Sequence, residues 1–416
     1  MITSSTWSGK RYAVLGLARS GRATVEALVA SEAEVLVWDD RAEAREAFVG
    51  RTAVADPLEA DLTGYAGVVV SPGVPLNTHP IAGHAAKFAV PVIGDIELFA
   101  QARAGLPPHK VVGITGTNGK STTTALTHHI LKTAGVPTTM GGNIGLPILE
   151  QEPLSEGGVY VLELSSYQID LTYSLDCDVA VLLNITPDHL DRYESFEDYR
   201  ESKLRLFAMQ TAGHVAKTGE SDAVLREVYA TDEQGRWPAL QGVHNLQNAD
   251  AAISACRVLG LQKDQIEDGL RTYPGLPHRM ERIAEIGGVV YINDSKGTNT
   301  AATAPALAAF DNIHWIVGGL AKEPGLGECE AQLGHVKAAY TIGKSGEDFA
   351  RLLAGRVPTV RSETVNRAVI DASNAAAPGD TVLLSPACAS FDQFRDFEHR
   401  GEVFRAAVAK LRNAAA

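Results

Sequence analysis

A glycine-rich segment between an apolar run and a helical stretch constrains this chain more than any other feature. It reads Gly113-Ile-Thr-Gly-Thr-Asn-Gly-Lys-Ser-Thr122, follows the apolar run 110–114 and leads into the helical stretch 122–134. Glycines let a backbone close around phosphate oxygens, and the N-terminus of a helix directs N–H groups at negative charge. The segment therefore predicts a phosphate-binding loop within a strand–loop–helix unit of a parallel sheet.

The loop departs in one respect from the common Gly-x4-Gly-Lys-Ser/Thr pattern. The first glycine of that pattern falls on Ile114, and glycines stand instead at 113 and 116. The ending Gly119-Lys120-Ser121 keeps the functional groups, since Lys120 is expected to reach the outer phosphates of ATP and the Ser121 hydroxyl to bind Mg²⁺. The alternative is a glycine-rich turn that binds no ligand.

Length and composition limit the class of protein. The 416 residues suggest two or three domains, and the net charge of −13 argues against binding to nucleic acid or to a membrane surface. No apolar run reaches the roughly 18 residues of a membrane-spanning helix. Widely spaced cysteines indicate buried thiols in a reducing compartment rather than a disulfide framework or a zinc site, namely Cys177, Cys256, Cys329 and Cys388. We therefore expect a cytoplasmic protein without membrane insertion.

Apolar runs of strand type alternate with helical stretches along the chain, which indicates α/β architecture with mostly parallel sheets. Three blocks are expected, at 1–105, 106–280 and 281–416, with a linker near 102–109. The expected strands are 12–15, 34–38, 67–70, 110–114, 159–162, 179–183, 289–292, 314–317, 338–342 and 381–384. The expected helices are 21–30, 122–134, 199–207 and 249–259.

Two further groups of polar residues follow apolar strands in the second block. Glu163 ends the run 159–162, where a carboxylate can face the phosphates, and Asp188-His189-Leu-Asp191 comes after the run 179–183. Mg²⁺ prefers oxygen ligands and usually keeps several waters, so these residues are candidate metal ligands. Taken singly, each is equally well explained as a helix cap or as a loop residue.

The first block begins with a turn of dinucleotide-binding type. Gly16-Leu-Ala-Arg-Ser-Gly21 resembles the Gly-x-Gly-x-x-Gly pattern, but Ala18 replaces the middle glycine. Asp39 lies 18 residues after Gly21, near the position of a ribose-binding acid. An NAD-binding protein is a weak interpretation, because no separate hydride-transfer site is apparent and the ATP loop stays unexplained.

Together these motifs resemble the Mur ligases over nearly the whole chain. The motifs that carry the resemblance are Thr115-Gly-Thr-Asn-Gly-Lys-Ser121, Asn143-Ile-Gly145, Glu163-Leu-Ser-Ser-Tyr-Gln168, Asp188-His-Leu-Asp-Arg-Tyr193, Lys203, His244-Asn245, His278-Arg279, Asn293-Asp-Ser-Lys296 and Ser385-Pro-Ala-Cys-Ala-Ser-Phe-Asp-Gln-Phe394. The loop variant with Ile114 is the form that this family uses. The last motif points to the branch of the family that adds D-glutamate.

The resemblance implies three α/β domains with mostly parallel sheets, Rossmann-like in the first and third and P-loop ATPase-like in the centre. They bind a UDP-sugar, ATP and the incoming amino acid, respectively. The implied reaction phosphorylates the carboxylate of UDP-N-acetylmuramoyl-L-alanine with ATP, and the amine of D-glutamate then attacks the acyl phosphate. This reaction belongs to cytoplasmic peptidoglycan precursor synthesis. A monomer that acts on small molecules is expected.

The resemblance also assigns residues, here in this chain's numbering. The implied catalytic residues are Lys120, Glu163, His189 and Lys203. ATP is assigned to Gly116, Thr117, Asn118, Gly119, Lys120, Ser121 and Thr122, with the adenine and ribose between the second and third blocks near Asn245, Arg279, Asp294 and Lys296. The UDP-sugar is assigned to Gly16, Leu17, Ala18, Arg19, Ser20, Asp39, Ser71, Pro72, Gly73, Asn77, His79 and Asn143. The amino acid is assigned to His189, Thr298, Lys322, Ser390 and Phe397.

Two Mg²⁺ ions are implied, held by Ser121, Glu163, His189 and a carbamylated Lys203. Without the family, Lys203 passes as a surface lysine, since long charged side chains on helices usually face water. A carbamate reverses its charge, turning a cation that repels Mg²⁺ into an anion that attracts it.

Other functions fit part of the pattern. A meso-diaminopimelate-adding relative usually carries an Asp-Asn-Pro-Arg motif, which is not found here, and folylpolyglutamate synthase lacks a comparable first block. Addition of L-glutamate stays open, because stereochemical choice depends on the shape of a pocket. A P-loop ATPase that switches a binding partner is the alternative from another class, and it predicts ATP turnover without an amino acid or a UDP-sugar.

Overall fold

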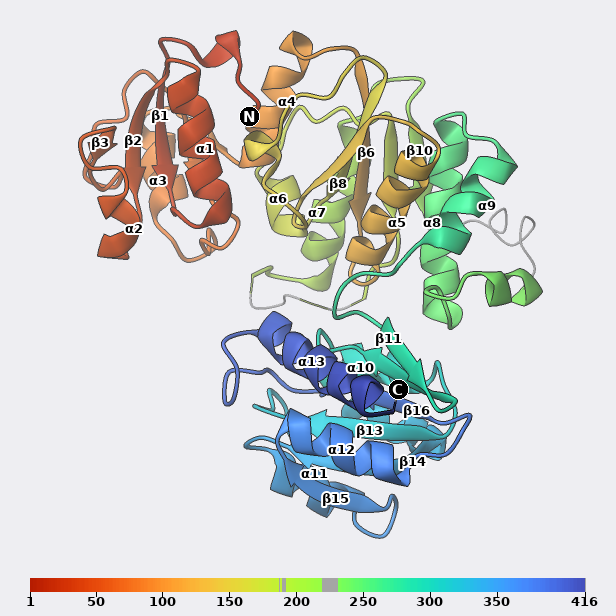
Figure 1. The fold of residues 1–416 in the computed structure, drawn as a ribbon. Helices are drawn as coiled ribbons and strands as arrows, with labels where there is room; N and C mark the ends of the chain where they lie inside the picture. The colour runs from red at the N-terminus through yellow and green to blue at the C-terminus, as the bar shows by residue number, and fades with distance from the viewer. Residues whose placement is uncertain (187, 189–191, 219–230, 416) are drawn as a thin grey trace. The chain divides into compact units, whose positions relative to one another are not determined.

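The computed structural model describes residues 1–186, 188, 192–218 and 231–415. The chain divides into two compact units, Met1–Ala230 with Gln247–Leu270 and Thr231–Leu246 with Arg271–Ala416. The first unit holds two five-stranded sheets and the second a six-stranded sheet (Figure 1). The predicted fold, three α/β domains with mostly parallel sheets, is confirmed. The domain boundaries at 105 and 280 stay a prediction.

The first sheet is parallel throughout and has the strand order β3-β2-β1-β4-β5. Its strands are apolar runs with both faces buried, as parallel sheets covered by helices require. The strands are β1 Arg11–Leu15, β2 Glu34–Trp38, β3 Ala53–Val54, β4 Tyr65–Val70 and β5 Val92–Ile93. The helices are η1 Ser5–Trp7, α1 Arg19–Ala30, α2 Ala42–Glu46, α3 Ile81–Lys87, α4 Asp95–Ala102 and η2 Arg103–Gly105. Helices α1 and α3 pack on opposite faces of this sheet.

The central sheet is also parallel, with the order β10-β9-β6-β8-β7. Helix α5 packs on one face, and α6 and α7 pack on the other. The strands are β6 His109–Thr115, β7 Thr138–Gly142, β8 Gly158–Glu163, β9 Val179–Leu182 and β10 Val215–Thr218. The helices are α5 Lys120–Thr133, η3 Ile148–Glu150, α6 Ser166–Asp170, α7 Phe196–Ala208, η5 Thr231–Arg236, α8 Val243–Val258 and α9 Lys263–Thr272.

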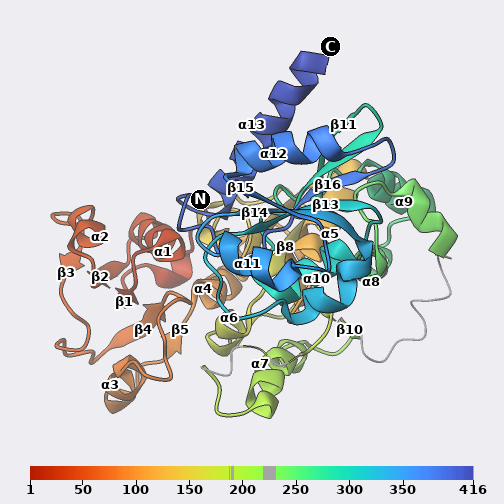
Figure 2. The ribbon, with the colours of Figure 1, turned by 90° about the horizontal axis from the view of Figure 1, so that it is seen from below.

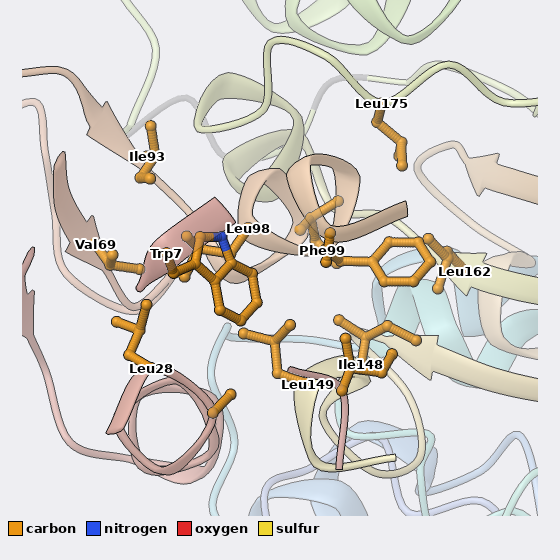
Figure 3. Packing of buried hydrophobic residues seen from close by; sticks show 14 of the residues in the cluster. Trp7, Leu28, Val69, Ile93, Leu98, Phe99, Ile148, Leu149, Leu162 and Leu175 are labelled. Carbon is orange, nitrogen blue, oxygen red and sulfur yellow. The ribbon is translucent and has the colours of Figure 1, made fainter. Parts of the chain in front are cut away.

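The first two sheets share one hydrophobic core. Trp7, Leu98 and Phe99 are fully buried in one cluster with Leu28 of α1 and with Leu149 and Leu162 of the central domain (Figure 3). A core that includes side chains of both domains joins them into one compact unit, because separating the domains exposes these apolar side chains to water.

The third sheet has the order β11-β12-β16-β13-β14-β15, and only the edge strand β11 is antiparallel. Helices α12 and α13 pack on one side of the strands, and α10 and α11 pack on the other (Figure 2). The strands are β11 Glu281–Ile286, β12 Val289–Asn293, β13 Ile313–Gly318, β14 Val336–Ile342, β15 Thr359–Glu363 and β16 Thr381–Leu384. The helices are α10 Thr300–Leu307, η6 Gly327–His335, α11 Gly346–Leu353, α12 Val365–Ala375 and α13 Phe397–Ala415.

Every predicted strand is present, and the strands 34–38 and 381–384 have the predicted bounds. The strands that were not predicted are β3, β5, β7, β10, β11 and β15, which are short or carry polar residues, and all six are sheet edges. All four cysteines are buried as expected, and burial raises the pKa of each thiol to about 12. Within the described part of the chain, every helix is too short or too polar to cross a membrane.

A buried charge network anchors the amino ends of the strands in the third sheet. The carboxylate of Asp380 accepts hydrogen bonds from His314 Nε2 at 3.0 Å and from Lys337 Nζ at 2.8 Å. It also accepts one from the backbone N–H of Ala377 at 2.8 Å. Burial acts to raise the pKa of Asp380, but these hydrogen bonds outweigh it and lower the pKa to about 2.

We expect Asp380→Asn to lower the free energy of unfolding by about 2 kcal/mol at pH 7, because the folded state there favours the ionised carboxylate. A folded pKa below the unfolded value of about 3.9 gives stability that is present above pH 4 and lost as pH falls towards 2. Urea unfolding of wild type and variant between pH 7 and pH 2.5 measures this difference. A difference that does not shrink with falling pH would contradict the role of the ionised carboxylate.

Candidate active site

The backbone of the phosphate loop depends on two glycines in the left-handed region. Gly116 has φ 151° and Gly119 has φ 84°, and Gly119 is the N-cap of α5. A Cβ on Gly119 would lie 2.2 Å from Asn248 Oδ1, and one on Gly116 would lie 3.0 Å from Leu183 Cβ. Gly113 serves packing instead, because its Cβ would lie 2.7 Å from Cys177 Sγ. The backbone conformation requires the glycines at 116 and 119, and close packing requires the one at 113.

A second loop, which follows β9, holds the phosphate loop in place. The N–H of Thr117 donates to the carbonyl of Asn184 at 2.9 Å, and the N–H of Asn118 donates to Asn184 Oδ1 at 2.9 Å. Asn184 Nδ2 returns a hydrogen bond to the carbonyl of Asn118 at 3.1 Å. The loop leads into the first turn of α5, and N–H groups in the first turn of a helix have no carbonyl of their own helix before them.

Two lysine amines meet at the carbonyl of Gly116. Lys120 Nζ donates to it at 2.9 Å and Lys203 Nζ at 3.0 Å. Lys203 comes from α7, is 2% exposed, and has its amine 4.6 Å from the centre of the Tyr199 ring. The interpretation of Lys203 as a surface lysine is therefore wrong.

Burial, reinforced by the charge of Lys120, lowers the pKa of Lys203 to about 7. A large share of this amine is consequently neutral at neutral pH. The neutral form is the nucleophilic form of an amine, and it is the form that can react with carbon dioxide to give a carbamate.

Glu163 presents a buried carboxylate on the face of the sheet that α5 covers. Glu163 is 2% exposed, and it lies beside Ile114 in the pairing of β8 with β6. Its side chain points to the face of the sheet opposite that of its neighbour Leu162. Its Oε1 accepts from Asn143 Nδ2 at 3.0 Å, whereas Oε2 is buried and has no hydrogen-bond partner in the described part of the chain. Ser121 lies in the first turn of the same α5.

An orphaned carboxylate oxygen fits a cation, because a buried charge without a partner is otherwise costly. One carboxylate and one hydroxyl suit Mg²⁺, which keeps water in much of its coordination shell. His189, the predicted third ligand, lies outside the described residues. Among those that are described, no cluster of three or more His, Cys, Asp or Glu side chains is arranged to bind a metal.

Of the residues assigned to the UDP-sugar, Asn143 follows β7 of the central sheet, and the others lie at the carboxyl edge of the first sheet, after the neighbouring strands β2, β1 and β4. Gly16 has φ 88°, its carbonyl accepts from Ser71 Oγ at 2.8 Å, and a Cβ on Gly21 would lie 1.8 Å from that carbonyl oxygen. Ala18 caps α1 without a side-chain hydrogen bond. The other residues are Leu17, Asp39, Pro72, Gly73, Asn77 and His79 on these loops, and Arg19 and Ser20 in the first turn of α1.

Asp39 closes the turn from the neighbouring strand. It accepts from the N–H of Leu17 at 2.7 Å and from Arg41 Nε at 3.1 Å. Burial acts to raise the pKa of Asp39, but the hydrogen bonds from Arg41 and Leu17 outweigh it and the pKa is lowered. Arg19 Nη2 donates to the carbonyl of Gly145 at 2.6 Å, which brings the segment with Asn143 beside α1. The turn thus combines a helix N-terminus that lacks a side-chain cap with contacts to the central domain.

In the second compact unit, Asp294 follows β12 and accepts from Ser385 Oγ at 2.6 Å and from the N–H of Met280 at 3.2 Å. Burial raises the pKa of Asp294 to about 7. The backbone N–H of Lys296 donates to the carbonyl of His278, beside Arg279, so three of the residues assigned to ATP lie in one cluster. Asn245 lies in the first turn of α8, where its Nδ2 donates to the carbonyl of Gln241 at 3.0 Å.

The residues assigned to the amino acid follow three adjacent strands of the third sheet. Thr298 follows β12, the exposed Lys322 follows β13, and Ser390, which is 2% exposed, follows β16. Backbone hydrogen bonds of 2.9 Å in each direction between Leu320 and Ala389 join the last two loops. Phe397 opens α13, and its ring centre lies 3.8 Å from Lys296 Nζ.

Sequence reasoning missed the residue that ties these loops together. Arg400 is fully buried and donates to the carbonyls of Ser295 at 2.8 Å and of Cys388 at 3.0 Å. Its Nε also donates to Ser295 Oγ at 3.0 Å, and burial lowers its pKa to about 10. Nothing in the pattern of a helix distinguishes such an arginine from a solvated one.

We expect Gly119→Ala to weaken binding of a nucleoside triphosphate by at least roughly tenfold, since the new Cβ displaces Asn248 and deforms the start of α5. Gly135→Ala is the matched control: it lies past the other end of α5 with φ 79° and nothing within 4 Å of its Cβ. The control should cost about 1 kcal/mol of stability and leave affinity unchanged. Calorimetric titration with ATP and Mg²⁺ measures both variants, and equal losses would contradict the assignment.

The chain is similar to families and proteins of known identity. Residues 114–234 match the family described as "Mur ligase middle domain", and residues 278–388 match "Mur ligase, glutamate ligase domain". A UDP-N-acetylmuramoylalanine–D-glutamate ligase of Novosphingobium aromaticivorans is 61% identical, over 99% of this chain and 97% of the relative. The ligase of the same name from Zymomonas mobilis is 54% identical, over 99% of this chain and 100% of the relative.

Solved structures agree at the level of the fold. The UDP-N-acetylmuramate–alanine ligase of Thermotoga maritima superposes with a TM-score of 0.57 at 17% identity, covering 97% of this chain and 99% of its own. E. coli FolC with ADP gives a TM-score of 0.53 at 18% identity, covering 82% of this chain and 99% of its own. With relatives more than half identical over almost their whole length, the chain belongs to the Mur ligase family, among the UDP-N-acetylmuramoylalanine–D-glutamate ligases.

Proposed function

We propose that this protein uses ATP to join D-glutamate to the L-alanine carboxylate of UDP-N-acetylmuramoyl-L-alanine, in cytoplasmic peptidoglycan precursor synthesis. The observation that carries the proposal is identity of 61% over 99% of the chain to a ligase of that name. The geometry supports it, since a glycine loop, two lysine amines and a buried carboxylate lie at the carboxyl edge of the central sheet.

The chemistry we propose proceeds in two steps. The γ-phosphoryl group of ATP passes to the substrate carboxylate, giving an acyl phosphate and ADP. The amine of D-glutamate then attacks the carbonyl carbon, and phosphate leaves from the tetrahedral intermediate to give the amide. Because two anions must approach each other in the first step, catalysis depends mainly on positioning and on neutralisation of charge.

For ATP, we propose that the first turn of α5 and the Lys120 amine hold the phosphates. The N–H groups of Thr117 and Asn118 are bonded to Asn184, so in this proposal they fix the loop rather than bind phosphate. Arg279, Asp294 and Lys296 are proposed to bind the nucleoside, together with Asn245.

For Mg²⁺, the orphaned Oε2 of Glu163 and the Ser121 hydroxyl are the proposed ligands of one ion. A bound Mg²⁺ neutralises charge between the phosphates and the attacking carboxylate. For a second ion we propose the Lys203 carbamate, formed when the neutral amine attacks carbon dioxide and releases a proton, with His189. The lowered pKa of Lys203 supports this step, because it makes the neutral amine available.

For the amino acid, we propose that Lys322 pairs with a carboxylate of glutamate and that Ser390 donates a hydrogen bond to it. Thr298 and Phe397 complete this site in the proposal. Thr298 lies on the loop that follows β12 and Ser390 on the loop that follows β16, next to the β13 loop that carries Lys322, and Phe397 begins α13.

The first experiment measures phosphate release with ATP, Mg²⁺, UDP-N-acetylmuramoyl-L-alanine and either D- or L-glutamate, and weighs the product by mass spectrometry. We expect release that needs every component and a product heavier by one glutamyl residue with the D isomer only. A product with L-glutamate would move the activity to a related ligase. Release with ATP alone would favour the ATPase-switch alternative instead.

Lys203→Ala should lower ligation at least a hundredfold, because it removes the group that becomes the carbamate, and a small carboxylate such as acetate should partly restore it. Arg200→Ala is the matched control on the same α7, since its side chain is 41% exposed and pairs with Glu197. Initial rates with and without acetate measure the effect. Full activity of Lys203→Ala would show the carbamate proposal to be wrong.

A further inference from the structure

Arg192 of the central domain reaches the substrate loop of the first domain. Its Nη2 donates to the carbonyl of Val74 at 3.1 Å and lies 3.5 Å from the carbonyl of Pro72. The loop after β4 carries these carbonyls together with Ser71 and Gly73, which are assigned to the UDP-sugar. The guanidinium of Arg192 has several N–H donors in a fixed plane, so it can hold this loop through its backbone carbonyls, without a charged side chain on the loop.

The other side of the guanidinium is held by an aromatic stack. Its central carbon lies 4.2 Å from the centre of the Tyr167 ring, a cation–π distance. Tyr167 in turn stacks on Tyr193, with ring centres 6.2 Å apart and planes 16° apart. The Tyr193 hydroxyl donates to Asp170 Oδ2 at 2.7 Å. Arg192 is thus fixed to the body of the central domain while it bonds to the loop.

Close packing does not set the distance between the loop and the central domain here. A cavity of about 130 Å³ separates the two, with Leu76 and Asn77 on the loop side and Tyr167, Leu171 and Tyr193 on the other. Among the residues that the structure describes, the hydrogen bond from Arg192 to the carbonyl of Val74 is a direct contact across this gap.

The same stack leads towards the phosphate loop. The Tyr193 hydroxyl lies 3.3 Å from Ser202 Oγ, and Ser202 donates to the carbonyl of Ser166 at 3.2 Å. Ser202 precedes Lys203 on α7, whose amine bonds to the carbonyl of Gly116. One chain of contacts therefore connects the substrate loop of the first domain to the ATP side of the central domain.

We propose that Arg192, clamped on Tyr167, is a positioning residue for the UDP-sugar substrate. It sets the loop 71–77 at a fixed distance from the central domain, so that a substrate bound to the first domain presents its carboxylate to ATP. The inference rests on the proposed function, whose own test is ligation by the wild-type protein.

The test is calorimetric titration of the full chain with UDP-N-acetylmuramoyl-L-alanine, together with steady-state kinetics. Arg192→Met should raise the Kd and the KM of this substrate roughly tenfold, the loss expected for a charged hydrogen bond and a stacked contact. The KM of ATP should change less than twofold, since the phosphate loop is untouched. An equal rise for both substrates would overturn the proposal, because it would indicate general damage to the fold.

Arg11→Met is the matched control. Arg11 also lies over a tyrosine, with its central carbon 4.9 Å from the Tyr65 ring centre, and also donates to a carbonyl, that of Thr63. Arg11 begins β1, at the edge of the first sheet opposite the loop 71–77, so this variant should leave the affinity for the UDP-sugar unchanged. A loss equal to that of Arg192→Met would overturn the proposal.

Two further variants separate positioning from direct binding of the substrate by charge. Tyr167→Leu removes the stack but no charge and should reproduce the Arg192→Met effect. The effects of Arg192→Met and Tyr167→Leu should be non-additive in the double variant. Normal affinity in Tyr167→Leu beside a loss in Arg192→Met would overturn the proposal in favour of direct binding by charge. If the wild-type protein ligates but Arg192→Met binds the UDP-sugar with normal affinity, only the proposed role of Arg192 is wrong. If the wild-type protein does not ligate, the proposed function is wrong.

Discussion

Parallel pairing of strands is the constraint on which the rest of this structure depends. Parallel strands bring all their carboxyl ends to the same edge, so loops distant in sequence meet there. In the central sheet, the pairing of β6 with β8 and β9 brings the phosphate loop beside Glu163 and Asn184. The first and third sheets repeat the arrangement, and most residues assigned to a ligand lie in a loop after a strand or in the first turn of the helix that follows that loop.

The central site concentrates charge that is costly to bury. Two amines share the carbonyl of Gly116, and a carboxylate oxygen of Glu163 is buried without a hydrogen bond from the described residues. Such groups lower stability by themselves, and strained or under-satisfied groups are typical of functional sites. The lowered pKa of Lys203 is a consequence of the same arrangement, because burial and Lys120 both disfavour its positive charge.

Coupling between the first and central domains uses two kinds of contact. The shared core around Trp7 and Phe99 joins the domains through apolar packing. The hydrophobic effect is non-directional, so this packing does not fix the orientation of a loop. The Arg192 bond to the carbonyl of Val74 is directional and acts on the loop assigned to the substrate. The first contact holds the two domains in one compact unit, and the second acts on a single loop.

The sequence by itself determined the strand–loop–helix unit, the three α/β blocks and the strands 34–38 and 381–384, because apolar periodicity and glycine requirements act locally. The short edge strands could not be predicted from the sequence, since their pairing is decided by neighbours far along the chain. Only the tertiary structure decided the burial of Lys203 and the roles of Arg192 and Arg400. A helix pattern does not reveal which lysine or arginine the rest of the chain encloses, and the low dielectric that changes its chemistry is created by that enclosure.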